Sequence, residues 1–252
     1  MKRTIKDKII WITRAGSGIG QSTAIKLSAL GAKVILSGRN KKKLNDTSIK
    51  CKDVSFIKTL DISDKNLVKK ITQEIIREFS KIDVLINCAG INIQDRDWDN
   101  IDEKDWDKIF QINVNGIFYC CKSTIPIMKK NKDGLIINVS SWAGKHVGLL
   151  SGVSYTSSKH ALNALTETIN MKYCDVGIRA CALCPGEVST PILDKRPKKL
   201  TNEQKRKMLQ PEDLAETIAF ICCMPKHVCI NELTISPTWH RRYIADLGIE
   251  EL

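Results

Sequence analysis

A tyrosine and a lysine with helical spacing are the first candidates for chemistry in this sequence. Tyr155 and Lys159 are four residues apart, which places both side chains on one face of a helix. An ammonium group close to a phenol favours the phenolate and lowers the phenol's pKa from its ordinary value of about 10. Such a phenol can donate a proton to a carbonyl oxygen or accept one from an alcohol. The pair alone is a weak signal, because this spacing occurs by chance in many helices.

A glycine-rich turn near the start of the chain is a second candidate, as a site for a phosphate-bearing cofactor. Gly16, Ser17, Gly18, Ile19 and Gly20 follow a short apolar segment and open a helical stretch. Glycines allow a tight turn and the close approach of a pyrophosphate, and the helix N-terminus supplies amide donors. A merely flexible turn would also hold glycines, but its place after a first strand favours the binding site.

The residues that follow the second and third predicted strands bear on which dinucleotide would bind. An acidic residue after the second strand would hydrogen-bond an adenosine ribose, and none is present there. Arg39 instead supplies a forked cation suited to phosphate, which favours NADP(H), with NAD(H) as the second choice. A solvated charge at the start of a helix is the alternative for Arg39. Asp61 is a candidate partner of the adenine amino group or a simple helix cap.

Strand-like and helix-like segments alternate along the chain and would bring these residues together. The predicted strands cover Ile9–Thr13, Lys33–Ser37, Ser55–Leu60, Ile82–Ile86, Leu135–Val139, Gly177–Leu183 and Glu232–Ile235. The later helices are predicted over Glu103–Lys130, with a kink near Pro126, over Val153–Tyr173 and over Pro211–Cys223. This alternation predicts an α/β fold, a Rossmann-type doubly wound parallel sheet of about seven strands with helices on both faces. Ligands bind outside the carboxyl ends of such strands, so the loops there should line one site.

Composition narrows the class of protein further. The 252 residues suit a single domain, with residues 191–210 as a polar substrate loop and residues 236–252 as a C-terminal tail. The formal net charge of +12 is spread along the chain without the clustered basic face that nucleic-acid binding needs. Ten cysteines without framework spacing indicate reduced thiols in a cytoplasmic protein and no metal site. No stretch is apolar for long enough to cross a membrane.

The motifs taken together resemble the classical short-chain dehydrogenase/reductase family. The resemblance runs from Ile9 to about Ile235, and its segments occur in the family's order: Thr13–Gly20, Asp61, Asn87–Gly90, Asn113, Ser141, Tyr155 with Lys159, and Pro185–Gly186 with Thr190. It implies that Tyr155 is the general acid/base and that Ser141 polarises the substrate oxygen. Lys159 would hold the nicotinamide ribose and lower the Tyr155 pKa, and Asn113 would hold a water that links Lys159 to solvent. Ser141 as a strand end and Asn113 as a helix cap or kink are the structural alternatives.

The resemblance also implies a set of cofactor-binding residues and an assembly. The set is Thr13, Arg14, Gly16, Ser17, Gly18, Ile19, Gly20, Arg39, Asp61, Ile62, Asn87, Ala89, Gly90, Tyr155, Lys159, Pro185, Gly186, Val188 and Thr190. Relatives commonly assemble through two long helices, which implies a homodimer or homotetramer. Covering a neighbouring subunit is one interpretation of the C-terminal tail.

Three residues or spacings depart from the family's pattern. Arg14 stands where the family usually has glycine, and it would either intrude on the cofactor or add a cation for the adenosine 2′-phosphate. Cys88 replaces a usual asparagine. The spacing from Ser141 to Tyr155 is one residue longer than is common, and Trp142 occupies the shorter spacing.

The expected function is an NADP(H)-dependent oxidoreductase that interconverts a ketone or aldehyde and an alcohol. Trp142, His146, Leu149 and Leu150 suggest a partly apolar substrate pocket or simply pack their own loop. A 3-oxoacyl-carrier-protein-type reductase is one alternative, because Lys195, Arg196, Lys198 and Lys199 could recruit an acidic partner. A non-enzymatic nucleotide-binding protein that kept the fold is the other.

Overall fold

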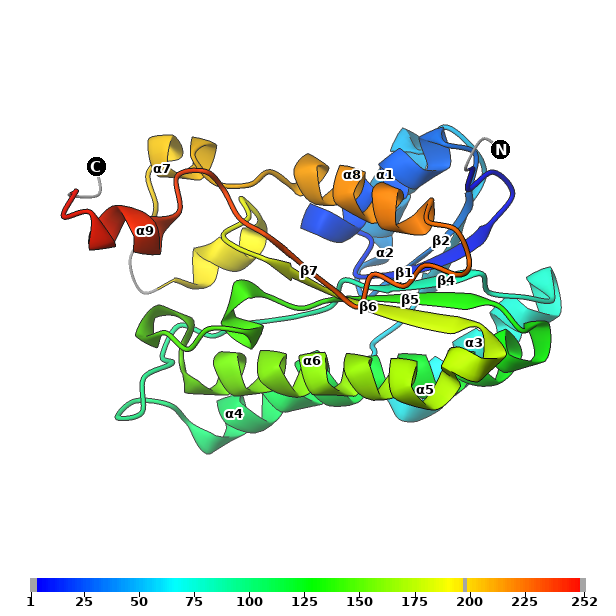
Figure 1. Ribbon diagram of the computed structural model, residues 1–252, viewed down its shortest axis with the longest axis horizontal. Helices are drawn as coiled ribbons and strands as arrows, with labels where there is room; N and C mark the ends of the chain where they lie inside the picture. Colours follow the sequence, from blue (N-terminus) through cyan, green and yellow to red (C-terminus); the bar gives the residue numbers. More distant parts are fainter. Residues whose placement is uncertain (1–3, 197–198, 250–252) are drawn as a thin grey trace.

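The computed structural model describes residues 4–196 and 199–249, and this part of the chain is built around a seven-stranded parallel sheet (Figure 1). The strand order is β3-β2-β1-β4-β5-β6-β7. The strands are β1 (Ile9–Thr13), β2 (Lys33–Gly38), β3 (Ser55–Thr59), β4 (Val84–Asn87), β5 (Gly134–Val139), β6 (Ile178–Pro185) and β7 (Glu232–Ile235). Their ends differ from the predicted ones by at most two residues, and the predicted fold class is confirmed.

Helices cover both faces of this sheet (Figure 1). One face carries α1 (Gly18–Ala29), α2 (Lys41–Lys50) and α8 (Pro211–Cys222), and the other carries α3 (Lys65–Phe79), α5 (Ile117–Asn131) and α6 (Val153–Tyr173). Every residue of β1 is buried, as expected for a central strand covered on two sides. Because side chains alternate along a strand, Ile10 and Ile12 join one apolar core while Ile9 and Trp11 join the other.

The long central helical stretch is interrupted at a different place from the predicted one. It consists of α4 (Glu103–Phe110), a π-helical turn at Gln111–Gly116, and α5, which contains Pro126. A Cβ atom on Gly116 would lie 2.7 Å from the Ile62 side chain, so the turn packs tightly beneath the segment that follows β3. The irregularity therefore lies at this contact and not at the proline.

The strand order reverses between β1 and β4, and the carboxyl ends of these two strands flank a hollow. The chain proceeds outward from β1 to β3 and then returns to place β4 on the other side of β1. Arg14 after β1 and Cys88 and Gly90 after β4 line the same cavity. We call the part of the cavity between these residues the switch-point crevice. Ligands of such sheets bind at this kind of reversal.

The segments after β6 and β7 lie beyond the carboxyl end of the sheet. The predicted substrate loop contains a 3₁₀ turn at Pro191–Lys195 and α7 (Asn202–Arg206), while residues 197–198 fall outside the described residues. The tail forms α9 (Arg241–Asp246), which lies at the same end of the molecule as α7 (Figure 1). Within residues 4–196 and 199–249, no helix combines the length and the apolar character that crossing a bilayer requires.

Candidate functional site

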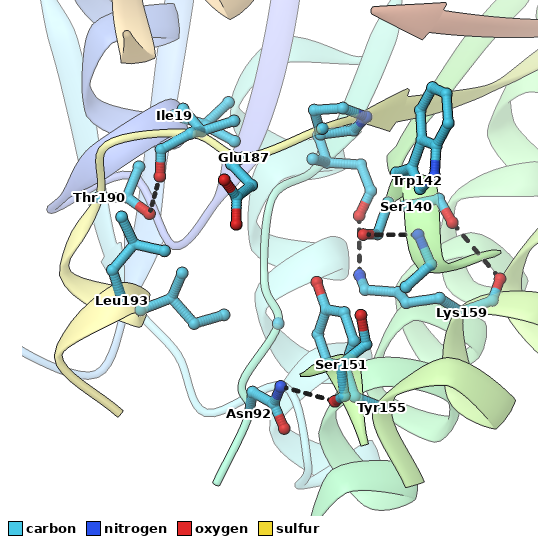
Figure 2. A pocket seen from close by; sticks show the side chains of 18 of the residues that line it. Ile19, Asn92, Ser140, Trp142, Ser151, Tyr155, Lys159, Glu187, Thr190 and Leu193 are labelled. Carbon is cyan, nitrogen blue, oxygen red and sulfur yellow. Dashed lines mark hydrogen bonds between the residues drawn. The ribbon is translucent and has the colours of Figure 1, made fainter. Parts of the chain in front are cut away.

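Tyr155 and Lys159 lie on the first two turns of α6 and extend into one cavity (Figure 2). The cavity has a volume of about 300 Å³. The Lys159 ammonium nitrogen lies 5.6 Å from the centre of the Tyr155 ring. It donates a hydrogen bond of 2.9 Å to the Val139 carbonyl at the end of β5. The helical spacing therefore brings the two side chains together as predicted.

Burial raises the pKa of the Tyr155 phenol above its ordinary value. A hydrogen bond with Ser141 and the positive charges of Arg14 and Arg96 act in the opposite direction. The direction differs from the predicted one, because loss of hydration outweighs the surrounding charges. Tyr155 is thus held as a protonated phenol, which is the form that donates a proton.

Burial also lowers the pKa of the Lys159 ammonium, to about 8. The neighbouring Arg14 charge adds to this effect. Only 2% of the residue is exposed. Lys159 can therefore exchange a proton near neutral pH, unlike an ordinary surface lysine.

Two adjacent serines, Ser140 and Ser141, follow β5 directly, and they have different partners. The Ser140 hydroxyl donates to the Lys159 backbone carbonyl over 3.3 Å and so ties the loop to α6. Ser141 accepts a hydrogen bond from the Ala143 amide at 3.1 Å and is the serine that bonds Tyr155. The structure thus joins Ser141, despite its longer spacing, to the tyrosine side chain.

Asn113 lies within the π-helical turn and is fully buried behind the cavity. Its side chain accepts from the Ile91 amide at 2.8 Å and donates to the Ile91 carbonyl at 3.0 Å. It also donates to the Ser158 hydroxyl at 3.2 Å. Asn113 therefore clamps the segment after β4 against α6, and its place in an irregular turn frees it for this role.

The glycine turn opens directly into the cavity. Ser17, Gly18, Ile19 and Gly20 line it, and a Cβ on Gly20 would lie 2.5 Å from the Arg14 carbonyl oxygen. The Ser17 side chain caps none of the amides at the start of α1. The Ser17 side chain therefore leaves these amides free for the predicted anion, whose binding stays a prediction.

Arg14 has a backbone φ of 53°, in the left-handed region that favours glycine. Its guanidinium Nη1 donates a short hydrogen bond to the Gly90 carbonyl oxygen. Burial lowers the pKa of this guanidinium. The side chain thus spans the switch-point crevice, from the end of β1 to the segment after β4.

The structure divides the predicted site residues into those that line the cavity and those that stand behind it. The lining set is Arg14, Ser17, Gly18, Ile19, Gly20, Gly90, Ser141, Tyr155, Lys159, Pro185, Gly186, Val188 and Thr190. The remaining predicted residues support the wall or lie farther along the sheet edge: Thr13, Gly16, Arg39, Asp61, Ile62, Asn87, Ala89 and Asn113. Asn87, for example, donates to Asn138 of β5 over 2.8 Å and is fully buried.

Arg39 and Asp61 meet at the edge of the sheet, at the ends of β2 and β3. The Arg39 Nη1 and the Asp61 Oδ2 are 3.9 Å apart, and 69% of the Arg39 side chain is exposed. Asp61 also accepts hydrogen bonds from the amide and hydroxyl of Ser63. The cap of α3 is Asp64, which accepts from the Asn66 and Leu67 amides. The helix-cap alternative for Asp61 is therefore wrong.

A carboxylate on the opposite wall of the cavity holds the substrate loop and the C-terminal tail together by charge. Glu187, which follows β6, accepts a short hydrogen bond from Arg196 of the substrate loop. It also accepts from the Arg241 Nε of α9 at 3.2 Å and 3.3 Å. Figure 2 shows Glu187, Thr190 and Leu193 across the cavity from Tyr155 and Lys159. We call the Arg196–Glu187–Arg241 contact the carboxylate clamp.

Arg96 is a buried residue of the wall that the sequence did not single out. It donates to the carbonyls of Gln94, Leu150 and Lys195, which belong to three loops. Only 7% of the residue is exposed. No periodicity or motif surrounds Arg96, so only the folded loops reveal this role.

The C-terminal tail lies over the cavity of its own chain. Trp142 stacks on His146 with ring centres 4.3 Å apart and meets His240 of the tail at 4.4 Å. His240 in turn lies 4.3 Å from Tyr243. Trp142 and His146 line the cavity and also stack on each other within their own loop, so the pocket and the loop-packing interpretations both stay predictions. The tail residues His240, Arg241 and Arg242 line the cavity, which the sequence did not predict.

The cysteines and acidic residues offer little to a metal. All ten cysteines lie in the described part of the chain, and none forms a disulfide. Among the described residues, no group of three or more His, Cys, Asp or Glu side chains could hold an ion.

Comparisons with known proteins agree with this architecture. The family model described as short chain dehydrogenase matches residues 8–201. An uncharacterized oxidoreductase of Staphylococcus aureus is 33% identical over 241 residues, which covers 92% of this chain and 98% of the relative. A solved alcohol dehydrogenase of Thermococcus sibiricus, in complex with 5-hydroxy-NADP, is 25% identical with a TM-score of 0.84 and covers 94% of this chain and 99% of its own.

A second solved structure is similar to the same extent. It is a 3-ketoacyl-(acyl-carrier-protein) reductase of Brucella melitensis in complex with NADH, 26% identical with a TM-score of 0.83. The match covers 92% of this chain and 98% of the reductase. The glycine turn, the parallel sheet and the matched family model lead to one conclusion: this chain belongs to the short-chain dehydrogenase family of oxidoreductases.

Proposed function

We propose that this protein is an NADP(H)-dependent oxidoreductase that interconverts a ketone or aldehyde and an alcohol, with Tyr155 as the general acid/base. The observation that carries the proposal is the convergence of Tyr155, Lys159 and Ser141 on the cavity that the glycine turn enters. A phenol, an ammonium and a hydroxyl at one point are suited to moving a proton to or from an oxygen atom.

Each of the three groups has a distinct part in carbonyl reduction. When bound, the nicotinamide supplies the hydride that reaches the carbonyl carbon. The Tyr155 hydroxyl donates its proton to the carbonyl oxygen, which the Ser141 hydroxyl polarises. The Lys159 ammonium, held by the Val139 carbonyl, stabilises the phenolate that remains. Alcohol oxidation uses the same groups in reverse, with Tyr155 as the base.

Several features of the chain fit a dinucleotide. The uncapped amides of α1 suit a pyrophosphate, and Gly18 lies so close to Thr190 that an added Cβ would approach its side chain to 3.1 Å. Arg14 is the exception, because its side chain spans the switch-point crevice.

Arg39 supports NADP(H) over NAD(H). Its guanidinium is largely exposed and only 3.9 Å from a single carboxylate oxygen, so it is accessible to a phosphate. The similar alcohol dehydrogenase holds an NADP derivative and the similar reductase holds NADH. Since relatives with the same fold take either cofactor, the preference of this chain depends on its own residues at the end of β2.

A carrier-protein substrate receives less support from the substrate loop. Arg196, one of the basic residues that suggested an acidic partner, points inward to Glu187 with 11% of its side chain exposed. The backbone of Lys195 is bonded to Arg96. Arg196 is therefore engaged within the chain, whereas Lys195 is held by its backbone and is itself exposed. On this balance we favour a small-molecule carbonyl substrate.

Cofactor titration followed by a ketone panel tests the proposal. We expect NADPH to bind more tightly than NADH in calorimetry. Tyr155→Phe should lower turnover by about 10²- to 10⁴-fold without loss of NADPH binding, because it removes only the transferable proton. Tyr173→Phe, at the far end of the same helix, is the matched control.

Each contrary outcome bears on a separate part of the proposal. Tighter NADH binding would contradict the role of Arg39 and leave the enzymatic assignment intact. Full activity of the Tyr155→Phe variant would contradict its role as the acid/base. Failure to bind either cofactor would instead favour a non-enzymatic protein that kept the fold.

A further inference from the structure

Arg14 stands at the point where the fold directs a ligand. It follows β1 directly, and β1 is the strand on which the sheet order reverses. Its neighbours around the crevice include glycines on both sides, Gly18 and Gly20 from the turn and Gly90 from the segment after β4. Small residues leave space there, and the arginine side chain fills part of that space.

The side chain is fixed at both of its ends. At the backbone, φ is 53° and the following amide, Ala15 N–H, donates to the Ser37 carbonyl at 2.9 Å. At the tip, Nη1 is bonded to the Gly90 carbonyl. A Cβ placed on Gly90 would lie 3.3 Å from the Lys159 ammonium, so the tip reaches the neighbourhood of Lys159. The Arg14 side chain thus crosses the switch-point crevice and occupies the space between the glycine turn and the candidate acid/base residues.

The electrostatic surroundings disfavour this position. The charge of Arg14 lowers the pKa of Lys159, and burial lowers the pKa of Arg14 itself. A neutral carbonyl is the hydrogen-bond partner at the tip, and the carboxylate that lines the same cavity, Glu187, is bonded to Arg196 and Arg241 instead. The contact is therefore one that an entering ligand can break.

We propose that Arg14 is a latch across the switch-point crevice, which must release Gly90 before a dinucleotide enters. The inference rests on the proposed function, since it supposes that the dinucleotide uses this crevice. A latched form that cannot bind lowers the apparent affinity by the fraction of molecules that are open. Removal of the side chain should therefore tighten cofactor binding.

The position of the guanidinium favours a latch over a phosphate ligand. Anions bind at the amides that begin α1, whereas the Arg14 tip bonds to the far side of the crevice at Gly90. A ligand role would require the side chain to sit beside the turn while the crevice stays open. The two roles predict opposite effects of truncation on affinity.

Calorimetric titration with NADPH and with NADH tests the latch directly, on the wild-type chain and on Arg14→Ala. Alanine keeps a Cβ at the position with positive φ and removes the rest of the side chain, so the variant tests the side chain separately from the backbone. If about a tenth of the wild-type molecules are open, the variant should bind about tenfold more tightly. Lys50→Ala removes one exposed charge at the end of α2 and serves as the matched control, with wild-type affinity expected.

Stopped-flow binding gives a second readout that does not depend on catalysis. A latch reduces the population that can bind, so Arg14→Ala should raise the association rate about as much as it tightens affinity, with the dissociation rate unchanged. Affinity that is equal to or weaker than wild type would overturn the latch and leave the proposed function standing. Binding of neither cofactor by either protein would overturn both.

Discussion

Lys159 shows how burial changes the chemistry of one side chain. Its ammonium lies among Tyr155, Val139 and Gly90, with 2% of the residue exposed, and its pKa is lowered to about 8. The ordinary pKa of a lysine side chain is about 10.4. Lys159 is therefore suited to passing a proton toward Tyr155 at physiological pH. Burial of the charged ammonium also costs the folded state free energy.

Lys159→Met should reveal this cost of burial through the pH dependence of the free energy of unfolding. The folded-state pKa is depressed, so between about pH 8 and 10.5 the unfolded chain binds more protons at this lysine, and the contribution of Lys159 to wild-type stability rises with pH. Methionine lacks this contribution. The stability of the variant relative to wild type should thus fall across that range, by on the order of 3 kcal/mol. Urea unfolding at pH 7, 8, 9 and 10 measures the difference.

The control for this measurement is Lys172→Met, because Lys172 is exposed near the end of the same helix. A constant loss of stability from the broken Val139 contact would shift all the Lys159→Met values equally and leave the trend intact. A difference that does not change with pH would contradict a depressed Lys159 pKa.

At the scale of elements, the sequence predicts well the features that depend on neighbouring residues and poorly those that depend on contacts between residues far apart in the chain. The strands are short runs of buried β-branched residues, so their places follow from local composition. The π-helical turn depends on Gly116 packing against Ile62, a residue far away in the chain. No local pattern encodes that contact, and the prediction therefore placed the irregularity at Pro126.

The candidate site likewise contains parts that local sequence predicts and parts that only the fold brings together. The glycine turn and the Tyr155–Lys159 pair are local spacings on single elements, and the sequence was sufficient to bring them together. Arg96 and the carboxylate clamp join loops that meet only after folding. The Tyr155 pKa was predicted in the wrong direction, because spacing reveals a neighbouring charge but not the loss of water around it.

The carboxylate clamp links three segments, so its removal should loosen the substrate loop and the tail together. Glu187→Gln keeps the shape of the side chain but removes the charge that Arg196 and Arg241 share. A loss of about 1–2 kcal/mol of local stability would raise the open population about tenfold. Limited trypsin digestion, read by mass spectrometry, should show faster cleavage within residues 191–210 and in the tail.

The matched control is Glu232→Gln at β7, whose carboxylate, within the described part of the chain, forms its ion pair with Lys145. It removes one surface-facing charge of the same kind and should leave the digestion of both segments unchanged. Cleavage of the Glu187→Gln variant at the wild-type rate would show that the loop and the tail are held by their other contacts, such as Arg96 and the Trp142–His240 packing.

At the scale of the whole molecule, the two apolar cores hold thiols as well as aliphatic side chains. Cys88 and Cys181 belong to one core and Cys121 to the other, while Cys222 packs against the first. Burial raises the pKa of each of these four thiols to about 12. The fold therefore keeps them protonated in alkaline solution, where the unfolded chain would ionise them.

This arrangement predicts that the protein loses stability in mild alkali. Because the folded-state pKa values are raised from 9.0, the contribution is complete below about pH 9 and is lost as the pH rises from there toward 12. Each thiol contributes a slope of up to about 1.4 kcal/mol per pH unit. Cys222→Ala should therefore reduce the alkaline slope of the unfolding free energy by about that amount.

Urea titrations at pH 8, 9, 10 and 10.5 in the presence of a reductant would measure this slope. Cys174→Ala, which removes an exposed thiol, is the control. Identical slopes for Cys222→Ala and wild type would mean that the core does not exclude water from this thiol.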